Sequence, residues 1–359
     1  MNKDKIQELA LDAITGLHRA GVGMSMGTGK TLTGLKHMSL QNKTDRFLVV
    51  APSIAILDSW KEEAVNWNFS EILKRITFTT YLSLNKLSPQ EFDCVYLDEC
   101  HAIKQKHEQF LSEYSGKILG LTGTPPKYKH GEKGRMISKY CPIVYEYLVD
   151  DAVNDKILND YEIRVHLLDL DSAKNIKVEY NNRHWFDSEQ KIYNYWTNRI
   201  GNENNEKFKI IRMKKLMTFE SKVKYAKKIL PLIKDKTILF ANTAVQADSF
   251  GIPVYHSKEK ESKKNLEEFK NGEISKLASI LQLKEGVNIP GLKVAVLLHS
   301  YGNERMASQR IGRVLRLNPD DKAIIHILCY KNTVDEEWVS KALEPFDSKK
   351  INYYNIVGN

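Results

Sequence analysis

A glycine-rich stretch near the N-terminus carries residues suited to binding phosphate. The segment "GMSMGTGKTLTG" contains Gly29, Lys30 and Thr31, which end the phosphate-binding pattern G-x-x-x-x-G-K-[ST]. Backbone N–H groups at a helix start bind phosphate, while the lysine reaches the outer phosphates and the threonine hydroxyl ligates Mg²⁺. Met24 stands where that pattern has its first glycine, so a plain glycine turn is the alternative. The residues expected to contact a nucleotide are Gly27, Thr28, Gly29, Lys30 and Thr31.

Two adjacent carboxylates follow an apolar stretch further along the chain. In "VYLDECH", Asp98 and Glu99 stand about seventy positions after Lys30. Hydrolysis of a nucleoside triphosphate needs one carboxylate at the metal and a second group that orients or deprotonates the attacking water. Asp98 suits the metal and Glu99 suits the water. An acidic turn after a strand is the alternative, and the order relative to the glycine-rich loop favours the catalytic interpretation.

A third group of residues lies almost three hundred positions beyond the loop. In "SQRIGRVLR", Gln309, Arg313 and Arg316 stand at i, i+4 and i+7, on one face of a predicted helix. Two arginines so placed can neutralise charge on a leaving phosphate, and a solvated basic helix face is the alternative. If they belong to a second domain, the site is complete only when the domains close, so hydrolysis becomes an opening and closing cycle.

The elements that must position these residues follow an alternating pattern. Short apolar strands at Arg46–Ser53, Phe92–Glu99 and Lys117–Pro126 alternate with helical stretches such as 54–67. This alternation indicates a mostly parallel sheet with helices on both faces, and ligands bind beyond the carboxyl ends of such strands. The polar residues expected at that edge are Ser53, Asp98, Glu99, Thr122 and Thr124.

The length of 359 residues fits two domains. We place the first at 1–150 and the second at 151–359, with a helical lead-in at about 185–233. The polar stretch "VDDAVNDKILNDYEIRVHLLDL" is interpreted as the crossover between them. A second set of strands begins at Lys236–Thr243 and continues through "IPVYHS", "LASILQL", "KVAVLLHS" and "KAIIHILCY". The predicted fold class is α/β, with one plan used twice.

Composition narrows the class of protein. The chain is 42% hydrophobic and 28% charged, and no apolar run approaches the ~18 residues of a membrane span. The N-terminus "MNKDKIQEL" lacks the apolar core of a signal peptide, so we expect a cytoplasmic protein without membrane contact. Four cysteines without CxxC spacing predict reduced thiols. The net charge of +9 favours a polyanionic partner.

The basic stretch "KFKIIRMKKLMTFESKVKYAKK" is expected to be helical. Its apolar residues recur at helical spacing and are predicted to face inward: Ile210, Ile211, Met213, Leu216 and Met217. Its lysines are predicted to form a solvated face, and a ridge that guides DNA is the alternative. Core packing is expected for each of the five tryptophans, Trp60, Trp67, Trp185, Trp196 and Trp338.

Taken in order, these segments resemble the motifs of superfamily 2 DExH-box helicases and translocases over nearly the whole chain. "MGTGKT" resembles motif I, "VVAPSIAILDSW" motif Ia, "DECH" motif II and "LTGTPP" motif III. "ILFANTAVQAD", "LKEGVNIPGL" and "QRIGRVLR" resemble motifs IV, V and VI. The resemblance implies two tandem RecA-like domains with the ATP site in the cleft between them, and ATP and Mg²⁺ as cofactors.

The resemblance also implies roles for single residues. Gln7 stands where the family has a glutamine that contacts adenine, and Gly286 and Asn288 would line the interdomain cleft. The residues that would couple nucleotide state to domain movement are His101, Thr122 and Thr124. The candidates for phosphate contacts with nucleic acid are Ser53, Thr80 and Thr243. Contacts to a nucleic-acid backbone give affinity and salt dependence but little sequence preference.

Subfamily signals are mixed. "LDECHAIK" and "HILCYKNTVDEEW" resemble Swi/Snf-type translocases, whereas "VYEYLVDDAVNDKILNDYEI" and "QRIGRVLR" resemble helicases related to type III restriction subunits. Met24 and Ser25 replace an acidic pair common in the Swi/Snf loop, His256-Ser257 replaces His-Gly, and Asn288 replaces Asp. None of these departures removes a catalytic group.

The expected function is an ATP-dependent nucleic-acid motor, with DNA favoured over RNA. Alternatives are a duplex translocase that does not separate strands, an RNA helicase, and a nucleotide-gated binding switch. The presence of both carboxylates and both arginines favours an active motor. The compact chain resembles helicases of phages and mobile elements, so we expect a monomer in a bacterial or phage-infected cytoplasm. A role in replication or recombination, with proteins of those pathways as partners, is the expected setting.

Overall fold

The computed structural model describes residues 1–25, 27–126, 131–180, 183–203, 205–280, 289–299 and 321–357. The chain folds into two compact units, of which the first is Met1–Leu158 and the second begins at Asn159. The boundary expected after residue 150 falls inside helix α7 (Val149–Asn154), which belongs to the first unit.

The first unit is built on a six-stranded sheet in the order β3-β2-β4-β5-β1-β6, with neighbouring strands parallel. The strands are β1 (Arg19–Met24), β2 (Phe47–Ala51), β3 (Ile76–Thr80), β4 (Cys94–Asp98), β5 (Lys117–Thr122) and β6 (Ile143–Tyr147). The strands predicted from apolar runs, β2, β4 and β5, are confirmed. Their runs are continuous because helices cover both faces of the sheet.

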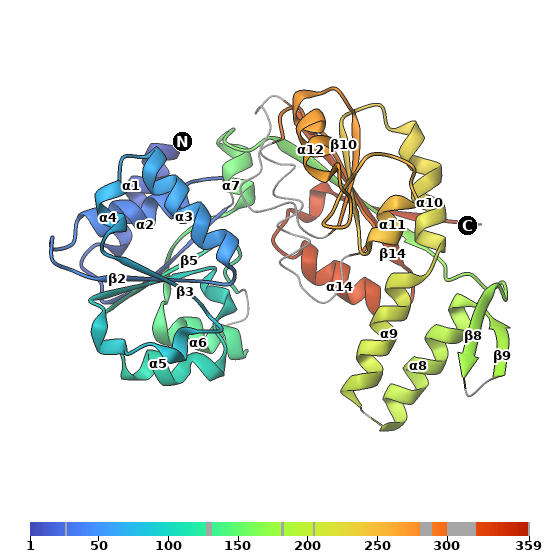
Figure 1. Ribbon diagram of the computed structural model, residues 1–359, viewed down its shortest axis with the longest axis horizontal. Coiled ribbons are helices and arrows are strands. Elements are labelled where there is room, and N and C mark those ends of the chain that lie inside the picture. Colours follow the sequence, from blue (N-terminus) through green and yellow to red (C-terminus); the bar gives the residue numbers. More distant parts are fainter. Residues whose placement is uncertain are drawn as a thin grey trace. The chain divides into compact units, whose positions relative to one another are not determined.

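Helices α1 (Lys3–Ile14), α2 (Lys30–Ser39), α3 (Ile54–Asn66) and α4 (Ser70–Leu73) cover one face of this sheet (Figure 1). Helices α5 (Glu108–Glu113) and α6 (Glu132–Tyr140) cover the other. Short 3₁₀ turns lie at Leu84–Lys86, Pro89–Glu91, Cys100–Ala102 and Gln105–His107. On the α5 side, Phe110 and Leu111 pack with Met136 and Ile137 against the sheet, which forms one half of the core.

The second unit contains a seven-stranded parallel sheet in the order β11-β12-β10-β13-β14-β7-β15. The strands are β7 (Asp160–Leu168), β10 (Thr237–Ala241), β11 (Val254–Tyr255), β12 (Lys276–Ile280), β13 (Val294–Leu297), β14 (Lys322–Tyr330) and β15 (Ile351–Ile356). The crossover interpretation was wrong for β7, which lies between β14 and β15. The polar and apolar residues of β7 alternate, as its exposed and buried positions do, so the segment lacks the continuous apolar run that marked the other strands.

The remaining elements of the second unit are mostly helical. They are α8 (Glu189–Glu203), α9 (Glu206–Thr218), α10 (Ser221–Ile229), α11 (Ala244–Asp248), α12 (Ser262–Asn271) and α14 (Val334–Leu343), with 3₁₀ turns at Leu230–Leu232 and Ser348–Lys350. An antiparallel pair, β8 (Ile176–Tyr180) and β9 (Arg183–Asp187), lies beside α8 and outside the seven-stranded sheet (Figure 1).

The helical interpretation of the basic stretch holds, with two corrections. Leu216 and Met217 near the end of α9 are buried as predicted, and Ile211 and Met213 are half-buried. Ile210, two helical turns before Met217 on the same face, is 49% exposed, so the prediction was wrong for this residue. Lys222 of α10 is not part of a solvated face. It is fully buried in an ion pair with Asp335, so its charge is matched inside the unit.

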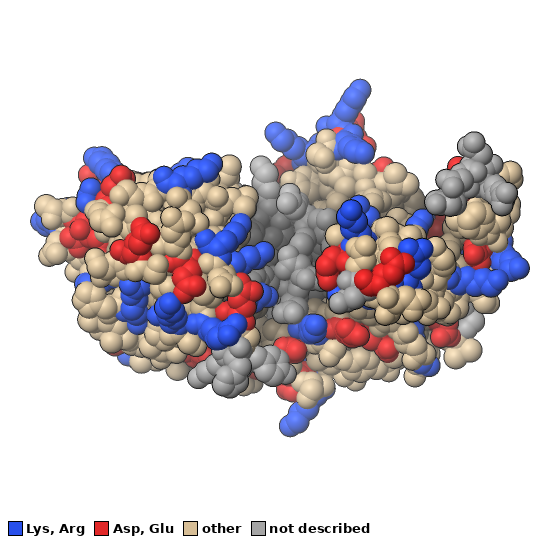
Figure 2. Space-filling view, turned by 90° about the horizontal axis from the view of Figure 1, so that it is seen from below, with Lys and Arg blue, Asp and Glu red and all other residues tan. Residues whose placement is uncertain are grey.

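The expectations for the tryptophans and the cysteines are partly confirmed and partly wrong. Trp60 is fully buried, whereas Trp67 and Trp185 are more than 40% exposed, so core packing was wrong for these two. All four cysteines are free, in keeping with the predicted reduced thiols, and all four are buried. No helix in the described part of the chain has the length and apolarity to cross a membrane. Lysine and arginine alternate with aspartate and glutamate over the described residues of the face in Figure 2.

Candidate functional site

The order of the first sheet explains how distant chemical groups meet. Strands β4, β5 and β1 are neighbours, and all three run in the same direction. Their carboxyl ends therefore share one edge, where ligands bind in open parallel sheets. The glycine-rich loop follows β1, Asp98 and Glu99 follow β4, and Thr122 ends β5. The sequence predicted this edge correctly.

The glycine-rich loop has a backbone that requires its glycines. Gly27 and Gly29 have φ values of 80° and 95°, in the left-handed region that other residues rarely adopt. Helix α2 starts at Lys30, and the residue before it, Gly29, supplies no side-chain cap to the first backbone N–H groups of the helix. Thr28 is buried, and its hydroxyl donates to the Ser25 carbonyl oxygen at 2.7 Å, which fixes the loop. This end of α2 suits a phosphate group.

Lys30 and Thr31 occupy the first turn of α2, and both are half-buried. The Lys30 Nζ donates to the main-chain oxygen of Met24 at 3.1 Å, a neutral acceptor within the loop itself. The lysine thus lies across the loop, where its hydrogen-bond partner carries no charge to match its own. A negatively charged ligand at the loop would supply that charge.

Gln7 of helix α1 lies directly against the loop and is 3% exposed. Its Nε2 donates to the Thr28 carbonyl oxygen at 3.2 Å, and its Oε1 accepts from Lys36 at 2.8 Å. A Cβ atom on Gly29 would come within 2.3 Å of the Gln7 Nε2. Gln7 therefore supports the loop, and both ends of its amide bind protein groups. Contact with adenine stays a prediction.

Asp98 is a buried carboxylate held by neutral donors. The Trp60 Nε1 donates to its Oδ2 at 2.7 Å, and the Glu99 backbone N–H donates to its Oδ1 at 2.8 Å. Burial raises the pKa of Asp98, while the Trp60 hydrogen bond, the Lys30 charge and the Glu99 N–H act in the opposite direction. A negative group with neutral partners at this edge fits a role as ligand to a divalent cation.

Glu99 has a strained backbone. Its φ of 47° and ψ of 53° place a non-glycine residue in the left-handed region, which directs its side chain differently from the strand before it. Its Oε2 accepts from the Gly123 N–H at 3.4 Å and lies 3.4 Å from the His101 Nδ1. Glu99 thus touches the segment that follows β5.

The three residues predicted to couple nucleotide state to movement do meet. The His101 Nδ1 lies 2.5 Å from the Thr122 hydroxyl oxygen and 3.2 Å from that of Thr124. The Thr124 N–H donates to the Thr122 hydroxyl at 3.1 Å. Because the same His101 atom also faces Glu99, the four side chains form one polar group beside Asp98. Their function in coupling stays a prediction.

The candidate nucleic-acid contacts lie at carboxyl ends of strands. Ser53 precedes α3, and its side chain does not cap that helix. Thr80 ends β3, and its register partner is Ala51 at the end of β2, so these two segments leave the sheet together. In the second unit, the Thr243 hydroxyl accepts from the Gln246 N–H at 3.2 Å and caps α11, which gives it a structural role.

Several predicted residues fall outside the described residues. They are Gly286, Asn288, Gln309, Arg313 and Arg316. Two residues that contact Asp98 were not singled out as functional from the sequence, Trp60 and Tyr81. Trp60 lies 38 positions and Tyr81 lies 17 positions before Asp98 in the sequence. No sequence pattern links either residue to Asp98, so only the tertiary contacts reveal them.

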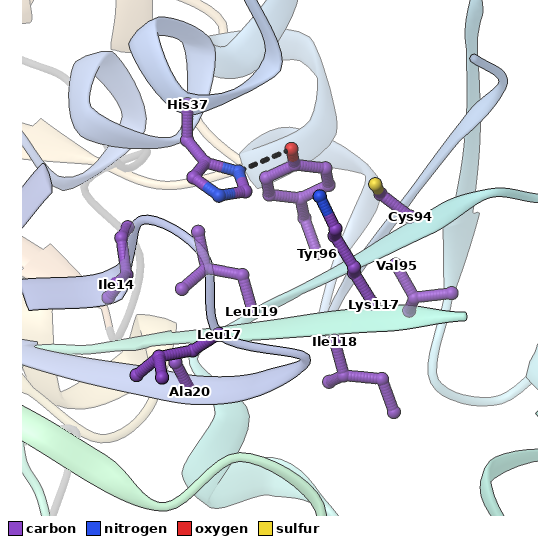
Figure 3. A pocket seen from close by; sticks show the side chains of 10 residues that line it. All are labelled: Ile14, Leu17, Ala20, His37, Cys94, Val95, Tyr96, Lys117, Ile118 and Leu119. Carbon is purple, nitrogen blue, oxygen red and sulfur yellow. Dashed lines mark hydrogen bonds between the residues drawn. The ribbon is translucent and has the colours of Figure 1, made fainter. Parts of the chain in front are cut away.

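A small cavity lies at the opposite edge of the same sheet (Figure 3). It is bordered by the first residues of β4 and β5, Cys94 and Lys117, and by His37 and Tyr96, which share a hydrogen bond. Its volume of about 10 Å³ is close to that of one water molecule. This cavity cannot hold a nucleotide, and the carboxyl edge remains the candidate site.

Comparison with known proteins matches a different family to each of the two units of the chain. Residues 1–127 match the family "Type III restriction enzyme, res subunit", and residues 209–318 match "Helicase conserved C-terminal domain". Together the two matches support a superfamily 2 helicase or translocase. The DNA 3'-5' translocase XPB2 of Sulfurisphaera tokodaii is 26% identical to this chain, and the aligned region covers 93% of this chain and 84% of the relative.

Solved structures share the fold. The ATP-dependent Type ISP restriction-modification enzyme LlaBIII bound to DNA aligns with 99% of this chain at a TM-score of 0.63 and 16% identity. The chain spans 31% of that enzyme's length. A fragment of an HsdR subunit of a type I restriction enzyme from Vibrio vulnificus aligns with 98% of this chain at a TM-score of 0.61 and 18% identity. The alignment covers 68% of that fragment. The Hef helicase domain of Pyrococcus furiosus aligns with 95% of this chain at a TM-score of 0.50 and 16% identity. The alignment covers 97% of that domain.

Proposed function

We propose that the protein is an ATP-driven motor that moves along or remodels DNA. The observation that carries this proposal is the shared carboxyl edge of β1, β4 and β5. There a loop with two left-handed glycines, a lysine and two adjacent carboxylates converge. The helicase-family matches in both halves of the chain support coupling of this chemistry to movement.

We infer the following chemistry for these residues. The N–H groups at the start of α2 and the Lys30 ammonium bind the phosphates of ATP, and Thr31 and Asp98 hold Mg²⁺. Bound Mg²⁺ supplies charge neutralisation to the phosphates. Glu99 orients the attacking water and accepts its proton. His101, Thr122 and Thr124 contact Glu99 or its neighbours, so they are suited to sense the state of the site.

The residues outside the described part of the chain complete the proposal. Gln309, Arg313 and Arg316 take part in hydrolysis, with the arginines neutralising charge on the transferred phosphoryl group. An arginine in this role contributes about 10³–10⁵-fold to the rate. Arg313→Ala and Arg316→Ala should therefore each reduce ATP turnover strongly, and full turnover in both variants would refute the role.

We propose DNA as the nucleic acid because the names of two similar proteins mention DNA. The XPB2 relative is named a DNA 3'-5' translocase, and LlaBIII was solved bound to DNA. We propose 3'-5' movement for this chain and contacts from Ser53, Thr80 and Thr243 to the DNA backbone. The name of that relative favours translocation as the form of movement. A role in replication or recombination is part of the proposal.

The test is ATP turnover measured without nucleic acid and with single-stranded DNA, duplex DNA, forked DNA and RNA. We expect one of the DNA substrates to stimulate turnover by about tenfold or more, because a misplacement of about 1 Å in a catalytic group can change a rate by about 10²-fold. Displacement of a third strand from duplex, compared with separation of a fork, distinguishes translocation from unwinding. Turnover that is indifferent to every nucleic acid would indicate a nucleotide-gated switch instead.

Two variants separate chemistry from DNA binding. Lys30→Ala removes a phosphate contact, and Glu99→Gln removes the proton acceptor while keeping the shape of the side chain. Both should abolish turnover and leave the Kd for DNA within about threefold of the original, because neither residue is a DNA contact in this scheme. Equal loss of DNA binding would show that the first unit had been misassigned.

A further inference from the structure

Two buried aromatic side chains reach Asp98 from separate segments of the first unit. Trp60 lies on α3 and donates its Nε1–H to the Asp98 Oδ2 at 2.7 Å. Tyr81 follows β3 and donates its hydroxyl to the main-chain oxygen of Asp98 at 2.9 Å. One donor therefore holds the carboxylate and the other holds the backbone of the same residue.

Both segments also carry a candidate nucleic-acid contact. Helix α3 begins directly after Ser53, and Tyr81 is the residue after Thr80. The segments are linked to each other, because the Tyr81 N–H donates to the Ala51 carbonyl oxygen at 3.1 Å. A backbone that binds at Ser53 and Thr80 would thus act on the two segments that hold Asp98.

The Trp60 ring is tightly packed in one position. The side chain is fully buried, and its far end lies against Gly34 of α2. A Cβ atom at Gly34 would lie 2.6 Å from the Trp60 Cη2, so the absence of a side chain there makes room for the ring. Because the ring is wedged between α2 and β4, a shift of α3 cannot leave the hydrogen bond to Asp98 unchanged.

Movement of Asp98 would pass to Glu99. The Glu99 N–H is bonded to the Asp98 Oδ1, and the strained Glu99 backbone is held between that bond and the contact of its carboxylate with Gly123. Bistable rather than continuous adjustment is expected of a packed and strained site of this kind. The path from Ser53 and Thr80 to Glu99 therefore consists of contacts within one unit.

We propose that Trp60 and Tyr81 are positioning residues that couple binding of nucleic acid at α3 and the β3 end to the geometry of Asp98 and Glu99. The inference rests on the proposed function, since it assumes that Ser53 and Thr80 contact nucleic acid. It assigns to two aromatic residues the link by which DNA accelerates hydrolysis.

The test uses Trp60→Phe and Tyr81→Phe, which keep most of the ring volume and remove the donor. The matched control is Tyr96→Phe. Tyr96 is buried on the same strand β4, but its hydroxyl bonds the His37 Nδ1 at 2.8 Å beside the small cavity (Figure 3). All three variants lose one buried hydrogen bond, so a merely structural effect would be shared by all.

The readout is the coupling factor, the ratio of the DNA Kd without and with a Mg²⁺-bound, non-hydrolysable ATP analogue. By linkage this equals the ratio of analogue Kd values without and with DNA. We expect a factor of about 5 or more in the original protein. Trp60→Phe and Tyr81→Phe should bring it to within about twofold of 1, with the DNA-free analogue Kd changed less than about threefold. Tyr96→Phe should keep the factor.

The outcomes are distinguishable. Retention of the full factor in Trp60→Phe and Tyr81→Phe overturns the inference, and so does equal loss in Tyr96→Phe. If the original protein shows neither coupling nor DNA-stimulated hydrolysis, the proposed function itself fails. If Trp60→Phe does not fold, Tyr81→Phe decides alone, since it removes a single oxygen atom.

Discussion

Each of the two parallel sheets has a buried aspartate at or just after the end of a strand, and the two aspartates have opposite surroundings. Asp98 ends β4 and is 6% exposed, while Asp335 lies in the first turn of α14 after β14 and is 2% exposed. Asp98 accepts hydrogen bonds from an indole N–H and a backbone N–H. Asp335 accepts from the Tyr330 N–H at 2.8 Å and from the Lys222 ammonium.

The difference lies in whether the charge is matched within the protein. The Asp335–Lys222 pair is neutral as a whole, so its burial is tolerated and it ties α10 to the start of α14. Asp98 has no ion pair among the described residues, and burial raises its pKa. A carboxylate kept without a fixed cation is available to an exchangeable one. The first aspartate therefore suits chemistry and the second suits stability.

The largest effect that would sharpen this comparison is on turnover. Asp98→Asn keeps the side-chain shape but removes the charge, so ATP hydrolysis should fall by about 10²–10³-fold or more. Unfolding by urea should show a loss of only about 1–3 kcal/mol, because the amide replaces one of two acceptor oxygens. A variant that hydrolyses ATP normally would break the comparison, since Asp98 would then be structural as well.

Asp335→Asn should show the reverse. The change leaves the Lys222 ammonium buried without its partner, which costs about 3–5 kcal/mol of unfolding free energy. Urea unfolding measures this loss, and the fraction that stays folded should keep its ATP turnover. The matched control is the double variant Lys222→Met with Asp335→Asn, which removes both charges, keeps an acceptor for the Tyr330 N–H and should recover most of the loss. No recovery would mean that the pair has a role beyond charge matching.

These two aspartates also show what the sequence reveals. Asp98 was found because a strand, two carboxylates and a glycine loop stand in a recognisable order, and parallel strands bring their carboxyl ends to one edge. Strands β2, β4, β5, β10 and β14 were found from apolar runs. These features are local or repetitive, so single-sequence patterns carry them.

Other features depend on partners far along the chain. Lys222 was assigned to a solvated face because its neighbours are lysines, yet Asp335 lies 113 positions away. Strand β7 was missed because its alternating polarity is also typical of an exposed segment, whereas here β14 and β15 cover its edges. The tryptophans look alike in the sequence, and only packing separates buried Trp60 from exposed Trp67. Pairings of this kind are set by the tertiary fold.

A smaller effect is expected at Gly34, beside the aromatic partner of Asp98. Glycine to alanine in a helix normally stabilises by about 0.5–1 kcal/mol. At Gly34 the added Cβ would meet the Trp60 ring, so Gly34→Ala should instead destabilise by about 1–3 kcal/mol. The control is Gly201→Ala in α8, where a Cβ would meet nothing within 4 Å and the usual gain is expected. If both substitutions raised the free energy of unfolding in urea equally, the Trp60 ring would not be tightly packed against Gly34.

The last effect concerns pH, and it tests whether neutral groups as well as charged groups stabilise the second unit. His166 on β7 and His326 on β14 stack, and the His166 Nε2 lies 2.8 Å from the His326 Nδ1. The Tyr225 hydroxyl lies 2.9 Å from the His166 Nδ1. Neutral rings satisfy both bonds, whereas two protonated rings would bring N–H groups face to face.

Burial, with the nearby Arg164 charge, lowers the pKa of His166 from 6.5 to about 4. Burial, and then His166 and Arg164, lower the pKa of His326 to about 4 as well. The unfolded chain therefore binds more protons between these values, so stability should be full above about pH 6.5 and should fall as the pH drops toward 4. The loss by pH 5 is at most about 2 kcal/mol for each ring.

Urea unfolding at pH 7.5 and pH 5 measures this loss. His326→Asn places an amide near the position of Nδ1 without a titrating group, so the difference in unfolding free energy between the two pH values should shrink by about half. His184→Asn in β9 is the control, since its side chain is exposed and should leave the pH dependence unchanged. An undiminished pH dependence in His326→Asn would place the acid-sensitive groups elsewhere. Stability of the second unit would then rest on the Lys222–Asp335 pair more than on the histidine stack.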